Sequence, residues 1–204
     1  MNIIPPSFEL EPIDGTAMLR RIEAAGRVCY KSEDRITEGS AERFVRMIVN
    51  SGHESVLEHE KITAKVVCDR GVTHEIVRHR IASYSQESTR YCNYGGEKFG
   101  GGLTFIKPCF WDEGSVPYKL WEAQMLSAER CYLSLLEQGA KPEEARAVLP
   151  NSLKAELVMT MNLREWRHFF RLRTATASHP QMRELACAML EAFRAALPVV
   201  FETL

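Results

Sequence analysis

Apolar and polar residues along the chain follow two different periods, and each period predicts a different kind of element. Within residues 14–32 apolar side chains recur every three to four positions, which predicts an amphipathic helix. Residues 61–69 alternate between polar and apolar side chains, which predicts a strand with one buried face. Residues 152–162 are ambiguous, because Leu and Ala favour a helix while the β-branched content near the end favours a strand. Further helices are predicted at 40–52, 71–80, 117–138, 163–173 and 179–197 and near Pro142, and a short strand at 103–107.

Boundary residues refine these predictions. Ser40 is expected to cap the helix at 40–52. Gly139 is expected to end the long helix at 117–138. Residues 94–102 are rich in glycine and predict a mobile loop. Helices alternate with few strands, no segment repeats, and no linker is long enough to divide the chain. The pattern therefore predicts one domain of the α+β or α/β class.

The composition excludes several classes of protein. Lys and Arg total 26 against 27 for Asp and Glu, and a net charge of -1 argues against coating nucleic acid or an anionic membrane with the whole surface. No run approaches the roughly 18 apolar residues of a membrane-spanning helix, and the N-terminus lacks the basic start of a signal peptide. The six cysteines are scattered without a CxxC pair, which predicts free thiols in a reducing cytoplasm.

The stretch VRHRIASYSQESTRY, residues 77–91, concentrates positive charge in this nearly neutral chain. Arg78, His79 and Arg80 are consecutive, and several hydroxyl side chains follow before Arg90. Guanidinium, hydroxyl and backbone N–H groups together are how proteins hold a phosphate. Because such cations repel one another unless an anion lies among them, the cluster predicts an anionic ligand. A solvated charged turn is the alternative for the three residues RHR taken alone.

A second basic cluster lies in NLREWRHFFRLR, residues 162–173. Only Glu165 in this segment would neutralise it. Two arginine-rich segments in a chain of net charge -1 are expected to come together around polyanions. The residues that would share one polar helix face are Arg164, Arg167, His168 and Arg171.

Other motifs give weaker signals. The spacing of His53 and His59 does not match HExxH, so no zinc site is predicted, and neither a P-loop nor a strand-borne GxGxxG is present. Three tyrosines beside the arginines could stack on the bases of single-stranded RNA, which leaves a non-catalytic nucleotide- or RNA-binding module as the alternative to an enzyme. Cys92 lacks a histidine at a spacing that would activate it, so a structural role is favoured.

Five segments resemble one known family. RHRIASYSQES, in which RHR is followed by seven residues and Ser, resembles the signature of the flavin-dependent thymidylate synthases. Four more segments resemble that family in the same order along the chain: GHESVLEHEKIT, ARAVLPNSL, NLREWRHFFRLR and SHPQMRELA. The resemblance implies an α+β fold with a mixed sheet core flanked by long helices. It also implies that residues 1–204 form a single catalytic domain, with active sites shared between the subunits of a homotetramer.

The resemblance also implies an activity. The chain would methylate dUMP to dTMP in the cytoplasm, with methylenetetrahydrofolate as carbon donor and NADPH as the reductant of bound FAD, and without nucleic-acid or membrane partners. Some members carry Gln in place of Glu75 and Asn-Glu in place of Ser85-Gln86. These departures leave a UMP-methylating relative open as an alternative.

Site residues follow from the same resemblance, and no metal is among the groups it implies. Arg173 would be catalytic, because a guanidinium against the N3–O edge of uracil favours the anionic form of the ring. In this family no cysteine attacks the pyrimidine, which agrees with the weak case for Cys92. The implied FAD-binding residues are His53, Ser55, Arg78, His79, Arg80, Gln86, Asn162, Arg164 and His168. The implied dUMP-binding residues are Glu75, Arg78, Gln86, Glu87, Ser88, Thr89, Arg90, Arg146 and Arg173.

Overall fold

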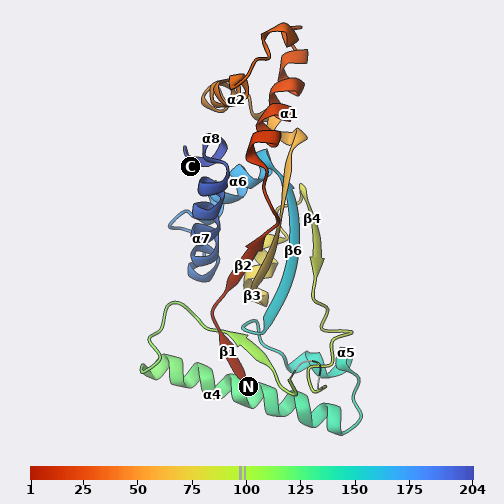
Figure 1. Cartoon of the computed structure of the whole chain (residues 1–204). Helices are drawn as coiled ribbons and strands as arrows, with labels where there is room; N and C mark the ends of the chain where they lie inside the picture. Colours follow the sequence, from red (N-terminus) through yellow and green to blue (C-terminus); the bar gives the residue numbers. More distant parts are fainter. Residues whose placement is uncertain (97, 99) are drawn as a thin grey trace. The chain divides into compact units, whose positions relative to one another are not determined.

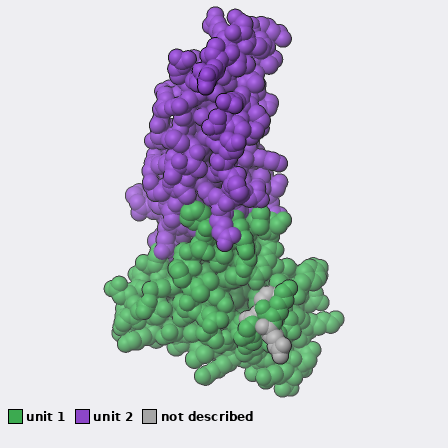
Figure 2. Space-filling model, viewed as in Figure 1, with its two compact units in different colours: residues 1–8, 65–78, 85–158 green, residues 9–64, 79–84, 159–204 purple. Residues whose placement is uncertain are grey.

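The computed structural model describes residues 1–96, 98 and 100–204, and the fold is α+β, as expected (Figure 1). Two residues of the predicted mobile loop, Glu97 and Phe99, lie outside the described part. The chain divides into two compact units (Figure 2). That the whole chain acts as one catalytic domain stays a prediction. Unit 1 comprises residues 1–8, 65–78 and 85–158, and unit 2 comprises residues 9–64, 79–84 and 159–204.

The strands form two sheets, and strands of the larger one contribute residues to both units. A parallel pair, β1 (Asn2–Ile4) and β5 (Thr104–Ile106), lies within unit 1. The four-stranded sheet has the order β2-β3-β6-β4, with β2 at Ser7–Leu10, β3 at Lys61–Asp69, β6 at Lys154–Asn162 and β4 at Ala82–Gln86.

Most described helices lie where the pattern predicts them, but α3 ends before residues 77–80 of the helix predicted at 71–80, and α8 was not predicted. None of the described helices is long and apolar enough to cross a membrane. Unit 2 contains α1 (Gly15–Val28), α2 (Ser40–Asn50), α6 (Leu163–Arg173), α7 (Pro180–Ala196), α8 (Pro198–Phe201) and the 3-10 turns η1 (Glu33–Arg35) and η2 (Glu54–His59). Unit 1 contains α3 (Arg70–Ile76), α4 (Val116–Glu137), α5 (Pro142–Ala145) and the 3-10 turn η4 (Arg146–Val148).

Helix α6 carries the second basic cluster and is fixed at its start and along one face. The Oδ1 of Asn162 accepts from the backbone N–H of Glu165 at 2.8 Å, which caps the helix. The indole of Trp166 is fully buried and donates to the carbonyl of Ile62 in β3 at 3.0 Å. Its ring packs against aromatic side chains of α6 and α7, and Phe201 of α8 packs against Phe170, so the apolar face of α6 is held in an aromatic core. The aromatic core consists of Trp166, Phe169, Phe170, Phe193 and Phe201.

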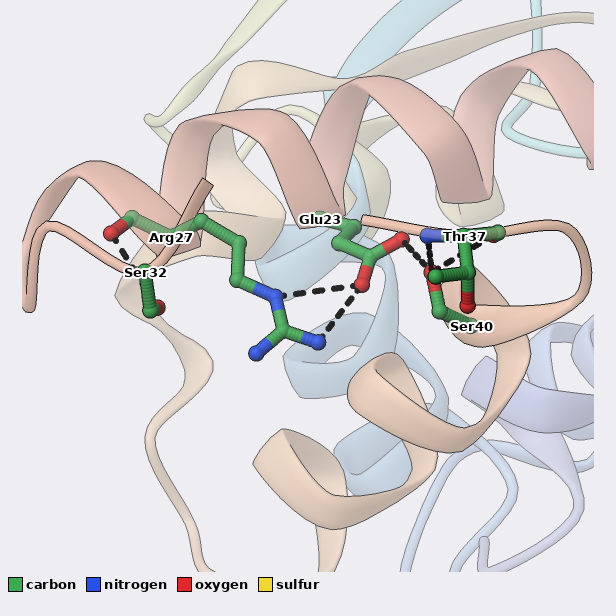
Figure 3. Close-up of polar contacts among 5 residues, drawn as sticks. All are labelled: Glu23, Arg27, Ser32, Thr37 and Ser40. Atoms are coloured by element: carbon green, nitrogen blue, oxygen red, sulfur yellow. Dashed lines mark hydrogen bonds and ion pairs between the residues drawn. The ribbon is translucent and has the colours of Figure 1, made fainter. Parts of the chain in front are cut away.

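A buried carboxylate joins α1 to the start of α2 in unit 2 (Figure 3). Glu23 is 1% exposed and accepts two hydrogen bonds from the guanidinium of Arg27, at 3.1 and 2.8 Å. The hydroxyl of Ser40 donates to the other oxygen of Glu23 at 2.7 Å and accepts from the N–H of Thr37 at 3.0 Å. Gly39, with φ of 73°, occupies the position that caps α2. The expectation that Ser40 caps this helix is therefore wrong, since its hydroxyl is used by Glu23 instead.

Replacing Glu23 with alanine is expected to lower the free energy of unfolding by about 2 kcal/mol, because Arg27 and Ser40 would lose a shared acceptor in a buried place. Chemical denaturation followed by circular dichroism measures the change. Glu42→Ala is the matched control, since Glu42 lies on α2 in an exposed pair with Arg46 and should shift stability by less than about 0.5 kcal/mol. Equal effects from both variants would contradict a stabilising role for the buried cluster.

Unit 1 has its own apolar core around α4. The helix begins where the Ser115 hydroxyl accepts from the N–H of Tyr118 at 3.3 Å, and it ends before Gly139, whose φ is +89°. A left-handed φ of this kind favours glycine, so the predicted end of the long helix is confirmed. The core residues of this unit, including Met125 and Tyr132 of α4 and Phe105 of β5, are Tyr94, Leu103, Phe105, Met125, Tyr132, Ala145 and Leu153.

Candidate functional site

A polar pocket of about 390 Å³ opens in unit 2 beside the start of α6, and we call it the arginine pocket. Three residues predicted to bind FAD, namely Asn162, Arg164 and His168, line it. The structure therefore brings these three together, although whether they bind a flavin stays a prediction. The complete lining is Glu54, Glu58, Ile81, Asn162, Arg164, Glu165, His168 and Arg171.

Acidic residues of η2 neutralise the arginines of α6. Glu54 accepts from Arg171 at 2.7 Å and from Arg167 at 3.0 Å, and Arg164 pairs with Glu58. Burial favours a raised pKa for Glu54, yet the hydrogen bond from Arg171 and the charge of Arg167 outweigh burial and hold that pKa below its ordinary value. The expectation that only Glu165 would neutralise this cluster is therefore wrong.

Arg167 departs from the predicted polar face. Its side chain is 3% exposed, and besides Glu54 it donates to the backbone carbonyl of Val200 next to the chain's end. Burial lowers its pKa, although the charge of Glu54 acts in the opposite direction. Arg164, His168 and Arg171 line the pocket, whereas Arg167 lies inside the unit and does not. Arg167 is thus a structural cation rather than part of the pocket.

His79 is buried, at 5% exposure, and does not line the arginine pocket, although it contacts Glu165 and His168, which do. Its Nδ1 lies 3.1 Å from the Oε1 of Glu165, and its Nε2 accepts from the Nε–H of Arg173 at 3.0 Å. Burial lowers the pKa of His79 most, and the nearby charge of Arg173 lowers it further. The ring is therefore neutral at physiological pH. Arg173, the predicted catalytic residue, is half-buried and held by this bond.

The side chains of His79, Glu165 and His168 offer ligand atoms that all lie within 4.8 Å of one another, which is close enough to consider a metal ion. A neutral histidine that accepts from Arg173 at Nε2 must carry its hydrogen on Nδ1. That Nδ1–H is directed at Glu165 and has no lone pair for a metal. The geometry therefore favours a hydrogen-bond network over a metal centre at these residues.

Other residues predicted to contact FAD lie at the surface. Arg78 and Arg80 are exposed, and neither guanidinium makes an ion pair or hydrogen bond to any part of the chain that the structure describes. His53 precedes η2 and is exposed, and Ser55 is exposed within it. None of the four lines the arginine pocket. Their cofactor contacts stay predictions, and the two unpaired guanidiniums are available to an anion.

A second and larger pocket, of about 690 Å³, lies within unit 1, and we call it the lysine pocket. Gln86 and Glu87, both predicted to bind dUMP, are among its lining residues. Its three lysines were not predicted from the sequence. A signal was present, because Lys154, Glu156 and Val158 alternate along β6 and so share one face of that strand. The lining consists of Lys65, Ser85, Gln86, Glu87, Cys92, Lys98, Thr104, Lys154, Glu156 and Val158.

Both carboxylate oxygens of Glu87 are engaged within unit 1. One accepts from the hydroxyl of Tyr94 at 2.9 Å, and the other accepts from Lys154 at 3.0 Å and from the N–H of Glu156 at 3.1 Å. Burial favours a lower pKa for Lys154, but its hydrogen bonds to Glu156 and Glu87 hold that pKa above its ordinary value. Glu87 thus anchors the chain after β4 to β6, and its contact with substrate stays a prediction.

The remaining residues predicted to bind dUMP surround this anchor in unit 1. Arg146 donates to the hydroxyl of Thr89 at 3.3 Å, although the two lie 57 positions apart in the sequence. The hydroxyl of Ser88 accepts from the N–H of Arg90 at 3.2 Å, which holds the turn. The structure therefore brings Arg146 to segment 86–90, as the dUMP prediction requires. The amide of Gln86 donates to Thr73 of α3, the helix that also carries Glu75.

Comparison with known proteins extends over most of the chain. A sequence model of the family described as "Thymidylate synthase complementing protein" matches residues 13–199. A flavin-dependent thymidylate synthase of Pyrococcus furiosus is 35% identical over 186 residues, which cover 91% of this chain and 75% of the relative. One from Geobacter sulfurreducens is 33% identical over 187 residues, which cover 88% of this chain and 79% of the relative.

Solved structures match the fold as well. The crystal structure of a UMP/dUMP methylase, PolB from Streptomyces cacaoi, bound with 5-Br dUMP, superposes with a TM-score of 0.80 at 29% identity and covers 99% of this chain and 96% of that one. The same methylase bound with 5-Br UMP gives a TM-score of 0.78 at 25% identity and covers 99% of this chain and 95% of that one. The similarity in sequence and in fold therefore extends along nearly the whole chain.

Proposed function

The chain belongs to the flavin-dependent thymidylate synthase family, and from this membership we propose that it converts dUMP to dTMP with FAD, methylenetetrahydrofolate and NADPH. As a member of that family it is a flavin-dependent methyltransferase. The observation that carries the proposal is the arginine pocket, where Asn162, Arg164 and His168 meet as the resemblance requires. Its volume lies within the range of small-molecule sites.

The residues of the arginine pocket fit an anionic, planar cofactor. Arg164 and Arg171 supply charged donors, and His168 presents an exposed ring beside them. The exposed guanidiniums of Arg78 and Arg80 supply further charge for a pyrophosphate, which supports FAD over a flavin with one phosphate. When bound, the flavin supplies the reducing chemistry that links NADPH to the pyrimidine. The protein's part is to bind and orient it.

The segment 86–90 and Arg146 are proposed to hold dUMP. Arg146 and Arg90 supply charge, and Ser88 and Thr89 supply hydroxyls, which together suit a nucleotide phosphate. Arg173 is proposed to lie against the uracil and to lower the pKa of its N3–H by electrostatic attraction. Its hydrogen bond to His79 limits the orientations available to the guanidinium. Substrate activation would thus depend on a preorganised cation.

One assay tests this function. Purified protein with FAD, NADPH and methylenetetrahydrofolate is given dUMP or UMP in parallel, and dTMP and its ribonucleotide counterpart are quantified. We expect a yellow protein and formation of dTMP. Product from UMP alone would favour the UMP-methylating alternative. The similarity to a UMP/dUMP methylase and the residues Glu75, Ser85 and Gln86 support that alternative. A protein that is colourless as purified and does not bind added FAD would favour the non-catalytic binding module.

We also propose a homotetramer in the cytoplasm. Large apolar side chains on α4 support the assembly, because Val116 and Leu120 are 70% and 67% exposed and a partner chain would cover them. All six cysteines are free, which suits a reducing compartment. Light scattering after size-exclusion chromatography measures the number of subunits.

Cys92→Ser is expected to keep kcat within about twofold of the wild type, because reduction by flavin needs no covalent bond from a cysteine. Cys92 is half-buried in the lysine pocket, and no histidine lines that pocket to activate the thiol. Steady-state formation of dTMP measures the effect. A variant that folds and binds flavin but is inactive would restore covalent attack on the pyrimidine as the mechanism.

A further inference from the structure

The side chain of Glu165 lines the arginine pocket and is also linked, through His79, to Arg173, the predicted catalytic residue. Building on the proposed function, we propose that Glu165 is a positioning residue that selects the tautomer of His79 and thereby orients the guanidinium of Arg173. The three side chains form one chain of hydrogen bonds within unit 2. We call it the Arg173–His79–Glu165 relay.

The direction of each hydrogen bond follows from the chemistry of the groups. An arginine Nε always carries hydrogen and only donates, so the His79 Nε2 at 3.0 Å must present its lone pair. A neutral imidazole has one N–H, and in His79 that hydrogen must then be on Nδ1. The carboxylate of Glu165 can only accept, and its Oε1 lies 3.1 Å from this Nδ1. Glu165 therefore stabilises the one tautomer that can hold Arg173.

The surroundings keep His79 neutral. His79 and Glu165 are 5% and 8% exposed, and burial is the largest cause that lowers the pKa of the histidine. The charges of Arg173 and His168 lower it further, against the opposing effect of Glu165. A protonated ring would carry hydrogen on Nε2 and could not accept from Arg173. His79 can therefore accept the hydrogen bond from Arg173 only while its ring is neutral.

Glu165 and His79 are each fixed by contacts outside the relay. The backbone N–H of Glu165 donates to the capping oxygen of Asn162 at 2.8 Å. The carbonyl of His79 accepts from the hydroxyl of Tyr84 at 2.7 Å, and the ring packs edge-on against Phe169 with centroids 5.0 Å apart. A ring held by its backbone and by an aromatic neighbour has few orientations available. The carboxylate then decides which nitrogen carries the hydrogen.

Glu165 and Arg173 stand at opposite ends of α6, which begins at Leu163 and ends at Arg173. Eight residues span about 12 Å along a helix, which is too far for direct contact. An effect of Glu165 on the guanidinium of Arg173 must therefore pass through His79. Glu165 also lines the arginine pocket, so the Kd for FAD is the measurement that separates a positioning role from direct binding of flavin.

Two variants of Glu165 test the relay by kinetics. Glu165→Ala removes the acceptor and should lower kcat by about ten- to hundredfold, with the KM for dUMP and the Kd for FAD within about threefold of the wild type. Glu165→Gln keeps an amide oxygen as acceptor and should recover at least part of the loss. Glu191→Ala is the matched control, because Glu191 is an exposed helical glutamate that pairs with Arg194 at the surface. A Glu165→Ala enzyme with wild-type kcat would overturn the proposal.

A double-mutant cycle separates the relay from a general loss of structure. His79→Gln breaks the link, so adding Glu165→Ala to it should change kcat by less than about twofold. Full multiplication of the two single effects would show that Glu165 acts on its own and would overturn the relay. Thermal unfolding of each variant establishes that it folds.

The tautomer itself is measured without turnover, by 15N NMR of histidine-labelled wild-type protein, with His79→Gln to assign the signal. We expect His79 to carry its hydrogen on Nδ1. An Nε2–H tautomer or a protonated ring at neutral pH would overturn the relay even if dTMP is formed. If dTMP is not formed but the Nδ1–H tautomer is observed, the proposed function fails and the hydrogen-bond relay stands.

Discussion

Replacing Arg173 with alanine is expected to lower dTMP formation by about a hundred- to a thousandfold while the protein still binds flavin. The guanidinium is proposed to stabilise charge that develops on the uracil, and the loss of one such group from a preorganised site has an effect of this size. Arg173 does not line the arginine pocket, so the affinity for flavin should stay within about threefold. Single-turnover dTMP formation measures the loss, and quenching of flavin fluorescence measures binding.

A conservative variant, Arg173→Lys, and a surface control, Arg43→Ala, test whether the effect comes from the guanidinium of Arg173. Arg173→Lys retains a charge but not the planar guanidinium, so it should recover only part of the activity. Arg43→Ala removes an exposed arginine of α2 and should leave turnover unchanged. If Arg173→Ala turned over dUMP at the wild-type rate, the proposed activation of uracil would have to be assigned to another cation.

Replacing Arg164 with alanine is expected to weaken flavin binding by about ten- to a hundredfold. A charged hydrogen bond contributes about 1.5–3 kcal/mol, and its loss converts to a change of that order in Kd. The effect should lie toward the upper end, because Glu58 would lose its partner and leave an uncompensated negative charge beside an anionic cofactor. Equilibrium titration of the apoprotein with FAD measures the Kd.

The salt dependence of that titration adds a second observable. Binding to the wild type should weaken as ionic strength rises, and Arg164→Ala should show a smaller dependence. Arg43→Ala again serves as the control and should match the wild type in both respects. An unchanged Kd for Arg164→Ala would mean that the arginine pocket does not hold the cofactor.

Elements with a clear period were predictable from the sequence. Strand β3 at Lys61–Asp69 and helix α6 at Leu163–Arg173 have the predicted bounds, since each buries one face. Strand β4 was missed because Ala82–Gln86 is short and carries only two apolar side chains, Ala82 and Tyr84. Strands β1 and β2 were missed because Pro5 and Pro6 interrupt the pattern. Pairing within a sheet, rather than local preference, makes these segments strands.

The candidate site was predictable in part. The family pattern named Asn162, Arg164 and His168, which the fold brings to one pocket. It did not reveal Glu54, because the pairing of Glu54 with Arg167 spans 113 positions and leaves no local signal. Nor could helical spacing show that Arg167 is buried, since its direction depends on where the end of the chain packs. Charge balance in a site is a property of the folded chain.

The carboxylate of Glu54 pairs with two arginines, Arg171 at the arginine pocket and Arg167 inside unit 2. Arg171 faces the pocket, whereas Arg167 also holds the carbonyl of Val200 close to the last residues. An anion that draws Arg171 away leaves more of that negative charge to Arg167 and so tightens the chain's final turn. Cofactor loading and resistance of the C-terminal tail to carboxypeptidase digestion should therefore rise together.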